Sequence, residues 1–133
     1  MNKKLFILCL TYLVLILTSC QESIITSNRD IVFPDSTVSY IKHVQPFIAV
    51  TCAYQGCHSD DPQQAKFSMT THSALIFAMA GGLVRPKNPD GSLLVQKLEG
   101  TSPHPYYFRW KDKVTQNQKK GIRKWIEEGA KDN

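Results

Sequence analysis

After residue 36, hydrophobic residues recur at helical spacing in four stretches, and no stretch shows the sustained alternation of a half-buried strand. The first stretch follows Ser36, a suitable helix N-cap. Its apolar face consists of Val38, Ile41, Val44 and Ile48. Pro46 lies within this stretch, and a proline removes a backbone donor and clashes with the preceding turn. We therefore expect a first helix that is kinked or restarted at Pro46.

Two shorter helices are expected in the middle of the chain, and each is followed by glycine. Residues 71–80 are mostly apolar and precede a Gly-Gly pair, and residues 92–98 precede Gly100. Glycine commonly ends helices because it adopts the left-handed conformation without a steric cost. The polar residues 59–68 and the Pro- and Gly-containing residues 85–91 are expected to be loops.

The last stretch gives the clearest helix signal, because Thr115 and Gln118 have the spacing of a capping box. The apolar face that follows consists of Ile122, Trp125, Ile126 and Ala130. We expect Trp125 to pack in the core rather than to take part in chemistry. Gly121, one turn earlier, would let another backbone or a flat cofactor approach closely. Together the four stretches predict little or no sheet.

The N-terminus indicates export. Lys3 and Lys4 precede an apolar run over residues 5–17, which is shorter than the ~20 residues of a transmembrane helix. Such a run indicates a signal peptide. The residues that close it, Leu-Thr-Ser-Cys, resemble a bacterial lipobox, and this resemblance implies that Cys20 is lipidated and becomes the first mature residue. The alternative is an uncleaved membrane anchor, and both interpretations tether the domain outside the cytoplasm.

We expect three parts: a lipoprotein signal peptide over residues 1–19, a lipid-anchored flexible tether over residues 20–36, and one domain over residues 37–133. The tether is expected because residues 21–34 are polar, lack periodicity and end in a proline. This organisation predicts a membrane-anchored lipoprotein of the cell envelope, in the periplasm or at the cell surface.

The charge of the mature chain is too small to indicate nucleic-acid binding. Of 16 Lys and Arg, Lys3 and Lys4 leave with the signal peptide, and the remaining 14 face 11 Asp and Glu, for a net charge of +3. The last third is the most basic part, with Arg109, Lys111, Lys113, Lys119, Lys120, Arg123 and Lys124. These side chains are expected to form a solvated helix surface, with docking to an acidic redox partner as the functional alternative.

The candidate chemistry lies in residues 52–58, Cys-Ala-Tyr-Gln-Gly-Cys-His. Covalent haem attachment uses one thiol for each of two vinyl groups and one histidine nitrogen for the iron, usually as C-x-x-C-H. Here four residues separate the cysteines. Once Cys20 is lipidated, an oxidising compartment leaves Cys52 and Cys57 to be captured by haem or by each other. The adjacent His58 favours haem. Zinc is not expected, because a structural zinc site normally has four ligands at paired spacing. Cys52, Cys57 and His58 supply three, and no second pair follows them.

Three segments in order resemble the small bacterial cytochrome c-like domains. Residues 44–47, Val-Gln-Pro-Phe, stand before the Cys-Cys-His site as that family's apolar-Pro-apolar entry does. Residues 89–94 resemble its Pro-x-x-Ser-x-Leu segment, and residues 125–130 resemble its closing Trp-Ile-x-x-Gly-Ala helix. The resemblance covers roughly residues 38–130.

This resemblance implies an all-α, cytochrome c-like fold in which the first and last helices cross. It implies one covalent haem c, with thioether bonds to Cys52 and Cys57 and with His58 as the proximal iron ligand. The chain departs from the family in its widened motif, which must bulge so that both sulfurs reach one porphyrin edge. Gly56, next to Cys57, would supply the unusual backbone angle.

The chain also departs from the family at the distal iron ligand. The family usually places a methionine shortly before the last helix, but residues 102–110 contain none. His104 lies there between two prolines, so bis-histidine ligation by His58 and His104 is the leading hypothesis. The alternatives are Met79, which is more often core at such a position, or no distal ligand. Met69, His43 and His72 are weaker candidates, and the aromatic residues Tyr106, Tyr107, Phe108 and Trp110 are expected to be core with some haem contact.

The resemblance implies a lipid-anchored monohaem cytochrome that transfers electrons to and from an unidentified redox partner protein. No catalytic constellation stands out in the mature chain, which favours a carrier over an enzyme. Two alternatives stay open at this point. One is a haem-based peroxidase or gas sensor with an open distal site, and the other is a haem-free surface lipoprotein stapled by a Cys52–Cys57 disulfide.

Overall fold

The computed structural model describes residues 27–60, 65–105 and 111–133, and within these ranges the protein is all-α, as predicted. The elements in chain order are η1 (Asn28–Asp30), η2 (Tyr40–Val44), α2 (Gln45–Thr51), α3 (His72–Gly81), α4 (Leu93–Glu99) and α6 (Gln116–Glu127). None of the described residues forms a strand. Among the same residues, no helix has both the length and the apolar character needed to cross a membrane.

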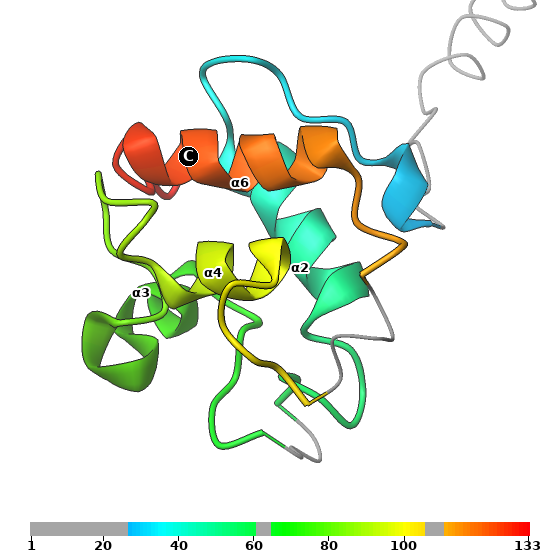
Figure 1. Cartoon of the computed structure of the whole chain (residues 1–133), viewed down its shortest axis with the longest axis vertical. Helices are drawn as coiled ribbons and strands as arrows, with labels where there is room; N and C mark the ends of the chain where they lie inside the picture. Colours follow the sequence, from blue (N-terminus) through cyan, green and yellow to red (C-terminus); the bar gives the residue numbers. More distant parts are fainter. Residues whose placement is uncertain (1–26, 61–64, 106–110) are drawn as a thin grey trace, which may run out of the picture.

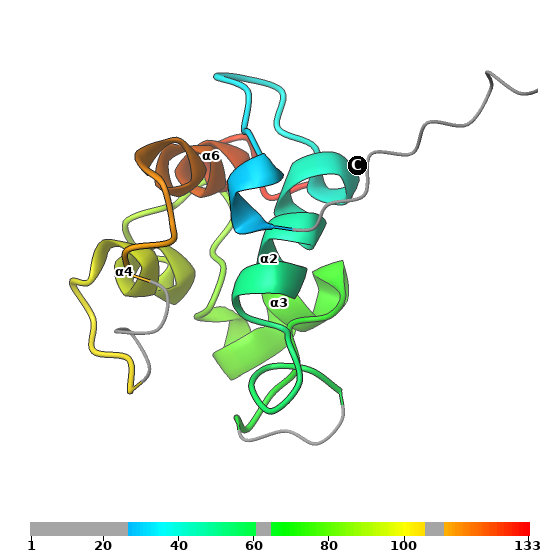
Figure 2. The ribbon, with the colours of Figure 1, turned by 90° about the vertical axis from the view of Figure 1, so that its right-hand side faces the viewer.

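The last helix, α6, lies along one end of the molecule, with α4 beside it and with α2 and α3 on the other side (Figures 1 and 2). Its predicted capping box is confirmed. The Thr115 hydroxyl accepts a hydrogen bond from the Gln118 backbone N–H (3.2 Å), and the Gln118 side chain accepts one from the Thr115 N–H (2.9 Å). These two bonds satisfy N–H groups that the helix itself leaves without partners.

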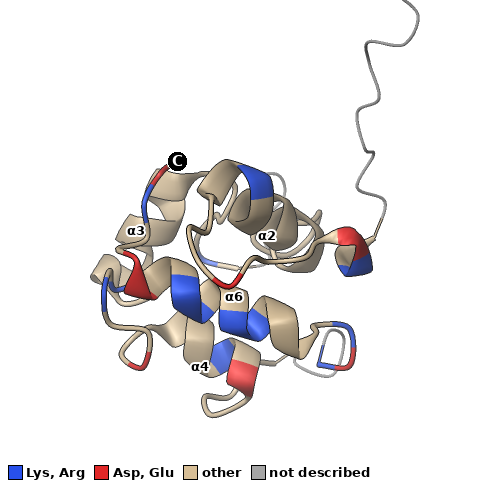
Figure 3. Ribbon diagram, turned by 90° about the horizontal axis from the view of Figure 1, so that it is seen from above, with Lys and Arg blue, Asp and Glu red and all other residues tan. Residues whose placement is uncertain are grey.

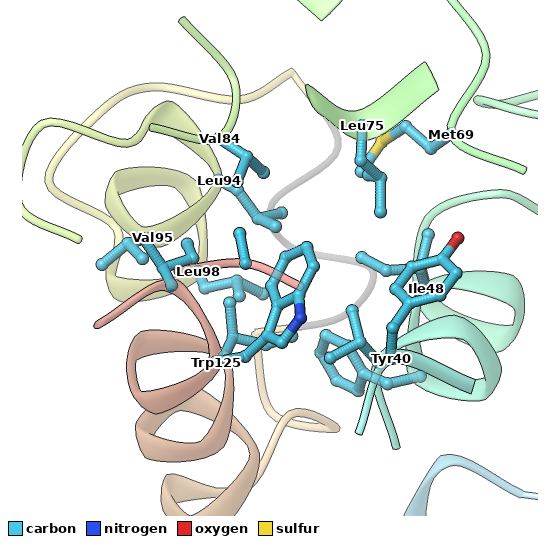
Figure 4. Close-up of a cluster of buried hydrophobic side chains, with 14 of the residues drawn as sticks. Tyr40, Ile48, Met69, Leu75, Val84, Leu94, Val95, Leu98 and Trp125 are labelled. Atoms are coloured by element: carbon cyan, nitrogen blue, oxygen red, sulfur yellow. The ribbon is translucent and has the colours of Figure 1, made fainter. Parts of the chain in front are cut away.

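Trp125 of α6 is a core residue, as predicted, and is only 1% exposed. It lies between Val95 and Leu98 of α4 on one side and Tyr40 and Ile48 on the other (Figure 4). Its ring stacks on that of Tyr40 at a centroid distance of 5.9 Å. Its indole N–H donates to the carbonyl of Lys131 (3.0 Å), so the polar edge of the ring has a partner.

Part of the segment predicted to be a tether packs on α6 through Phe33. Phe33 is 2% exposed, and a Cβ on Gly121 would lie 2.1 Å from its ring. The group that lies against Gly121 is therefore a side chain, the Phe33 ring, where the sequence predicted a backbone or a flat cofactor. The side chain of Asn117 pairs with both the N–H and the C=O of Phe33 (2.8 and 2.9 Å), and Ile31 is also buried. The apolar residues 31–33 form too short a run in a polar segment to predict this packing.

The first helical region begins later than predicted and is restarted at Pro46. Ser39, not Ser36, caps η2, because its hydroxyl accepts from the Lys42 N–H (3.2 Å). The π-helical turn of η2 then passes into α2, where Pro46 occupies the first turn and needs no donor. The prediction of an apolar face was wrong for Ile41, which is 61% exposed. A π turn holds more residues than an α turn, so the α spacing does not apply across it.

Helix α3 begins at the Thr71 cap and ends at the predicted Gly-Gly pair, but its last turn is not a regular helix. Met79 (φ 53°) and Ala80 (φ 54°) are left-handed, which is uncommon for residues with a side chain. The prediction that Met79 is more often core was wrong, since Met79 is 53% exposed. The left-handed turn takes its side chain off the helix face that Leu75 occupies in the core.

Helix α4 ends at Gly100, whose φ of 79° confirms the predicted left-handed cap. Arg123 of α6 ties this helix in place by pairing with Glu99 (3.4 Å) and with Asp90 in the loop before α4. Besides Arg123, α6 carries the basic residues Lys119, Lys120 and Lys124. Figure 3 shows this helix from above with its Lys and Arg residues in blue.

Candidate functional site

A cavity of about 300 Å³ lies in the half of the molecule away from α6, and its size is within the range of small-molecule sites. Its walls come from the end of α2, the Cys52–His58 turn, the segment after it, α3, α4 and the loop that follows α4. Most lining side chains are apolar, including Phe67, Met69, Leu83, Leu94 and Leu98. Because several of these also belong to the core, the cavity is a continuation of the hydrophobic interior.

The turn over residues 52–58 is closed by backbone hydrogen bonds. The N–H of His58 donates to the carbonyl of Cys52 (3.1 Å), and the N–H of Cys57 donates to that of Tyr54 (3.0 Å). Gly56 has a φ of +82°, so it supplies the left-handed angle that the widened spacing was predicted to need. The turn brings both cysteines and His58 to the wall of one cavity.

Cys52 and Cys57 are half-buried free thiols at this wall. Burial, and to a smaller extent the neighbouring Cys57, raise the pKa of the Cys52 thiol to about 12. Cys52 is therefore protonated at neutral pH and is not an activated nucleophile of the kind that cysteine enzymes use.

His58 is held at its backbone and at its ring. Its carbonyl accepts from the Met69 N–H (2.8 Å), and its Nδ1 lies 3.1 Å from the carbonyl oxygen of Phe67. A carbonyl only accepts, so Nδ1 carries the proton and Nε2 of the neutral ring carries the lone pair. Metal-binding histidines usually donate their second N–H to such a carbonyl, which fixes the tautomer and the ring orientation.

His104 lines the same cavity, and its ring centroid lies 6.3 Å from that of His58. Burial lowers the pKa of His58, although its bond to the Phe67 carbonyl opposes the shift. The pKa of His104 is lowered by burial and then by the charges of His58 and Lys97. Both imidazoles are therefore mostly neutral at pH 7, which is the form that binds metal ions.

The other predicted candidates divide between the cavity and the rest of the molecule. Met79 lines the cavity although it is largely exposed, and buried Met69 also lines it. His43 and His72 lie elsewhere and have partners: Nδ1 of His43 accepts from the Ser39 N–H (3.0 Å), and Nε2 of His72 donates to the Ala130 carbonyl (2.7 Å). Cys20 and the aromatic residues 106–108 and 110 lie outside the described residues.

Sequence reasoning missed two residues at the site. Phe67 orients His58 through its carbonyl and packs against the imidazole at a centroid distance of 4.4 Å. Lys97 brings an ammonium to the cavity wall from α4. Phe67 lies in a segment predicted to be a loop, and a backbone carbonyl leaves no trace in residue type. Lys97 looked like an ordinary surface lysine of a short helix.

The basic side chains of α6 do not take part in this site. No lining residue comes from α6, and Figure 1 shows α6 and the turn that follows α2 at opposite ends of the molecule. Within the described residues, no group of three or more His, Cys, Asp or Glu side chains is arranged to hold a metal ion. Comparisons with protein-family models, with curated proteins and with solved structures find no match to this chain.

Proposed function

We propose that this chain is a lipid-anchored c-type cytochrome that carries electrons with one covalent haem in the cavity. The observation that carries the proposal is the pairing of His58 and His104 across a cavity whose wall also holds Cys52 and Cys57. The resemblance of the sequence to small cytochrome c-like domains supports the same fold and function.

The spacing of the two imidazoles fits a shared metal ion. The ring centroids lie 6.3 Å apart, so with metal–nitrogen bonds of about 2 Å both rings would be close enough to hold one iron. The alternative interpretation, a pair of unrelated loop histidines, leaves the orienting bond from His58 to Phe67 and the neutral state of both rings without a purpose.

The residues around the cavity fit the remaining demands of haem. Cys52 and Cys57 would bind the vinyl groups as thioethers, which makes the cofactor a staple of a small domain. The haem supplies a one-electron redox centre when it is bound. The apolar walls would exclude water and set a low dielectric around that centre, and His58 and His104 would hold the iron. Because methionine raises the potential, two histidine ligands favour a lower potential than a His/Met pair.

The cellular setting is proposed from the N-terminal sequence. Lipid on Cys20 holds the protein at a membrane of the cell envelope, and the residues between Cys20 and the packed domain connect the two. A redox partner would have to come close to the haem, so its docking surface is proposed at the cavity end and not at the basic side chains of α6, which lie away from the cavity.

Haem content decides this proposal. The full chain is produced in a host with a cytochrome c maturation system, and we expect one covalently bound haem per chain in the pyridine haemochrome assay. Cys52→Ala combined with Cys57→Ala removes this haem, whereas Lys119→Ala combined with Lys120→Ala, on α6 away from the cavity, serves as the matched control and retains it. Wild-type protein that lacks the haemochrome band and has a mass showing two oxidised thiols contradicts the proposal.

The distal ligand is tested by a pair of substitutions. His104→Ala is expected to convert the low-spin spectrum to a five-coordinate one and to allow rapid carbon monoxide binding by the reduced protein. Met79→Leu removes the competing thioether from the same cavity and is expected to leave the spectrum unchanged. If wild-type protein binds carbon monoxide rapidly, the open-site alternative, a haem enzyme or gas sensor, replaces the carrier.

A further inference from the structure

The loop that carries His104 is folded back against the end of α4. Gly100 reverses the chain with its φ of 79°, and the N–H groups of Thr101 and Ser102 then both donate to the carbonyl of Gln96 (3.0 and 3.2 Å). These bonds fix the start of the loop, but they end two residues before His104. The next two residues need a further support if the imidazole is to face His58 in one orientation.

Lys97 supplies that support from the last turn of α4. Its ammonium donates to the Ser102 hydroxyl (2.9 Å) and to the carbonyl of Pro103, the residue that immediately precedes His104. Charge-assisted hydrogen bonds are stronger than neutral ones. Pro103 also has a fixed φ, so holding its carbonyl restricts where the following residue can lie.

The surroundings of Lys97 set it apart from the other lysines of the chain. Lys97 is half-buried and lines the cavity, whereas none of Lys119, Lys120 and Lys124 on α6 lines it. A lysine that is only solvated would not need two hydrogen-bond acceptors within one loop. Lys97 and His104 line the same cavity.

We propose that Lys97 is a positioning residue that latches the loop over residues 101–104 and holds His104 opposite His58. This rests on the proposed function, in which His104 is the distal iron ligand. Lys97 does not touch the iron. It acts through Ser102 and Pro103, and its loss frees His104 to leave the iron.

The test compares Lys97→Met, Lys97→Arg and the exposed control Lys120→Met in the haem-loaded full chain. We expect the affinity of the ferric protein for added imidazole to rise about tenfold in Lys97→Met, as expected for the loss of one charge-assisted hydrogen bond. Lys97→Arg keeps the charge and the donors, so it should recover most of the wild-type behaviour. Lys120→Met should equal wild type. Circular dichroism checks that each variant is folded.

A double-mutant comparison separates the latch from a general effect on folding. In a His104→Ala background the distal position is already open, so Lys97→Met should not change imidazole affinity further. Equal effects of Lys97→Met in both backgrounds overturn the proposal, as does wild-type affinity in Lys97→Met.

Hydrogen exchange tests the latch without relying on haem. Exchange of the Ser102 amide should accelerate about tenfold in Lys97→Met and stay at the wild-type rate in Lys120→Met. An unchanged Ser102 rate overturns the latch even if haem is bound. Absence of haem from the wild-type protein overturns the proposed function, and the exchange rates still decide whether Lys97 holds the loop.

Discussion

The two ends of this small domain are built differently. We call η1, η2, α2 and α6 the packed end, and residues 52–60 and 65–69, α3 and the loop over residues 100–105 the cavity end. At the packed end, Phe47 and Ile122 are fully buried, and a glycine leaves a slot that Phe33 fills. At the cavity end, Phe77 is 75% exposed, the backbone is left-handed at Met79, and an apolar space remains.

The difference shows where stability and function are separated. Close packing around Phe47 and Ile122 at one end allows the other end to keep an unfilled apolar space of the kind that small-molecule sites use. The haem proposed for the cavity would fill the space that the packed end fills with side chains.

The largest test of this contrast compares two phenylalanines. Phe47→Ala at the packed end should lower the free energy of unfolding by about 3–5 kcal/mol, because it removes a fully buried ring. Phe77→Ala, which removes the same atoms from a largely exposed ring at the cavity end, should change it by about 0.5 kcal/mol or less. Urea unfolding of the haem-loaded protein measures both, and similar losses would mean that the two ends are equally packed.

A smaller effect on the free energy of unfolding is expected where the Phe33 ring lies against Gly121 of α6. Gly121→Ala places a methyl group 2.1 Å from the Phe33 ring, and overpacking costs about 1–3 kcal/mol, which outweighs the helix propensity gained, about 1 kcal/mol. Phe33→Ala also destabilises, because the ring is buried. The double variant should therefore lose less than the sum of the two single losses. Strict additivity in urea unfolding would show that the methyl group and the ring do not meet.

The smallest effect concerns a carboxylate at the packed end. Glu128 accepts hydrogen bonds from the backbone N–H groups of Thr37 and Val38 (2.8 and 2.9 Å). Burial alone would raise its pKa, but these bonds, with the nearby Lys124 and Lys131, bring it below the usual 4.5. A lowered pKa stabilises the fold above the unfolded value and loses that contribution as pH falls through the folded value.

Glu128→Gln should therefore cost about 1 kcal/mol at pH 7, with the difference from wild type shrinking below about pH 4.5. Urea unfolding from pH 7 to pH 3 measures this. Glu127→Gln, one residue earlier on the exposed face, is the control and should stay within about 0.5 kcal/mol of wild type. A loss at Glu128 that is independent of pH would show that its charge plays no part.

Much of the packed end could be predicted from the sequence, since its signals are local. The capping box at Thr115, the buried face around Trp125 and the restart at Pro46 each depend on residues within a few turns. The prediction of buried residues failed where burial does not follow the regular spacing of an α-helix. The π-helical turn of η2 exposed Ile41, and the polar segment before residue 37 proved to contain the buried Phe33.

The candidate site was predicted in its residues but not in its geometry. Cys52, Cys57 and His58 form a recognisable string, and the two prolines beside His104 single it out. The carbonyl of Phe67, which orients His58, and the ammonium of Lys97, which holds the loop before His104, are contacts between separate segments. Every residue has a backbone carbonyl, and lysine is common on helix surfaces, so neither group carries a sequence signal of its own.

The sequence by itself therefore determined the helical class, the main helices and the thiol–imidazole string, because capping, glycine stops and periodicity act over short distances. Only the tertiary structure decided that His104 faces His58, that Met79 leaves the core, and that the basic side chains of α6 lie away from the cavity. Each of these depends on how loops and helices pack across the whole domain, and such packing is fixed by contacts between residues that are distant along the chain.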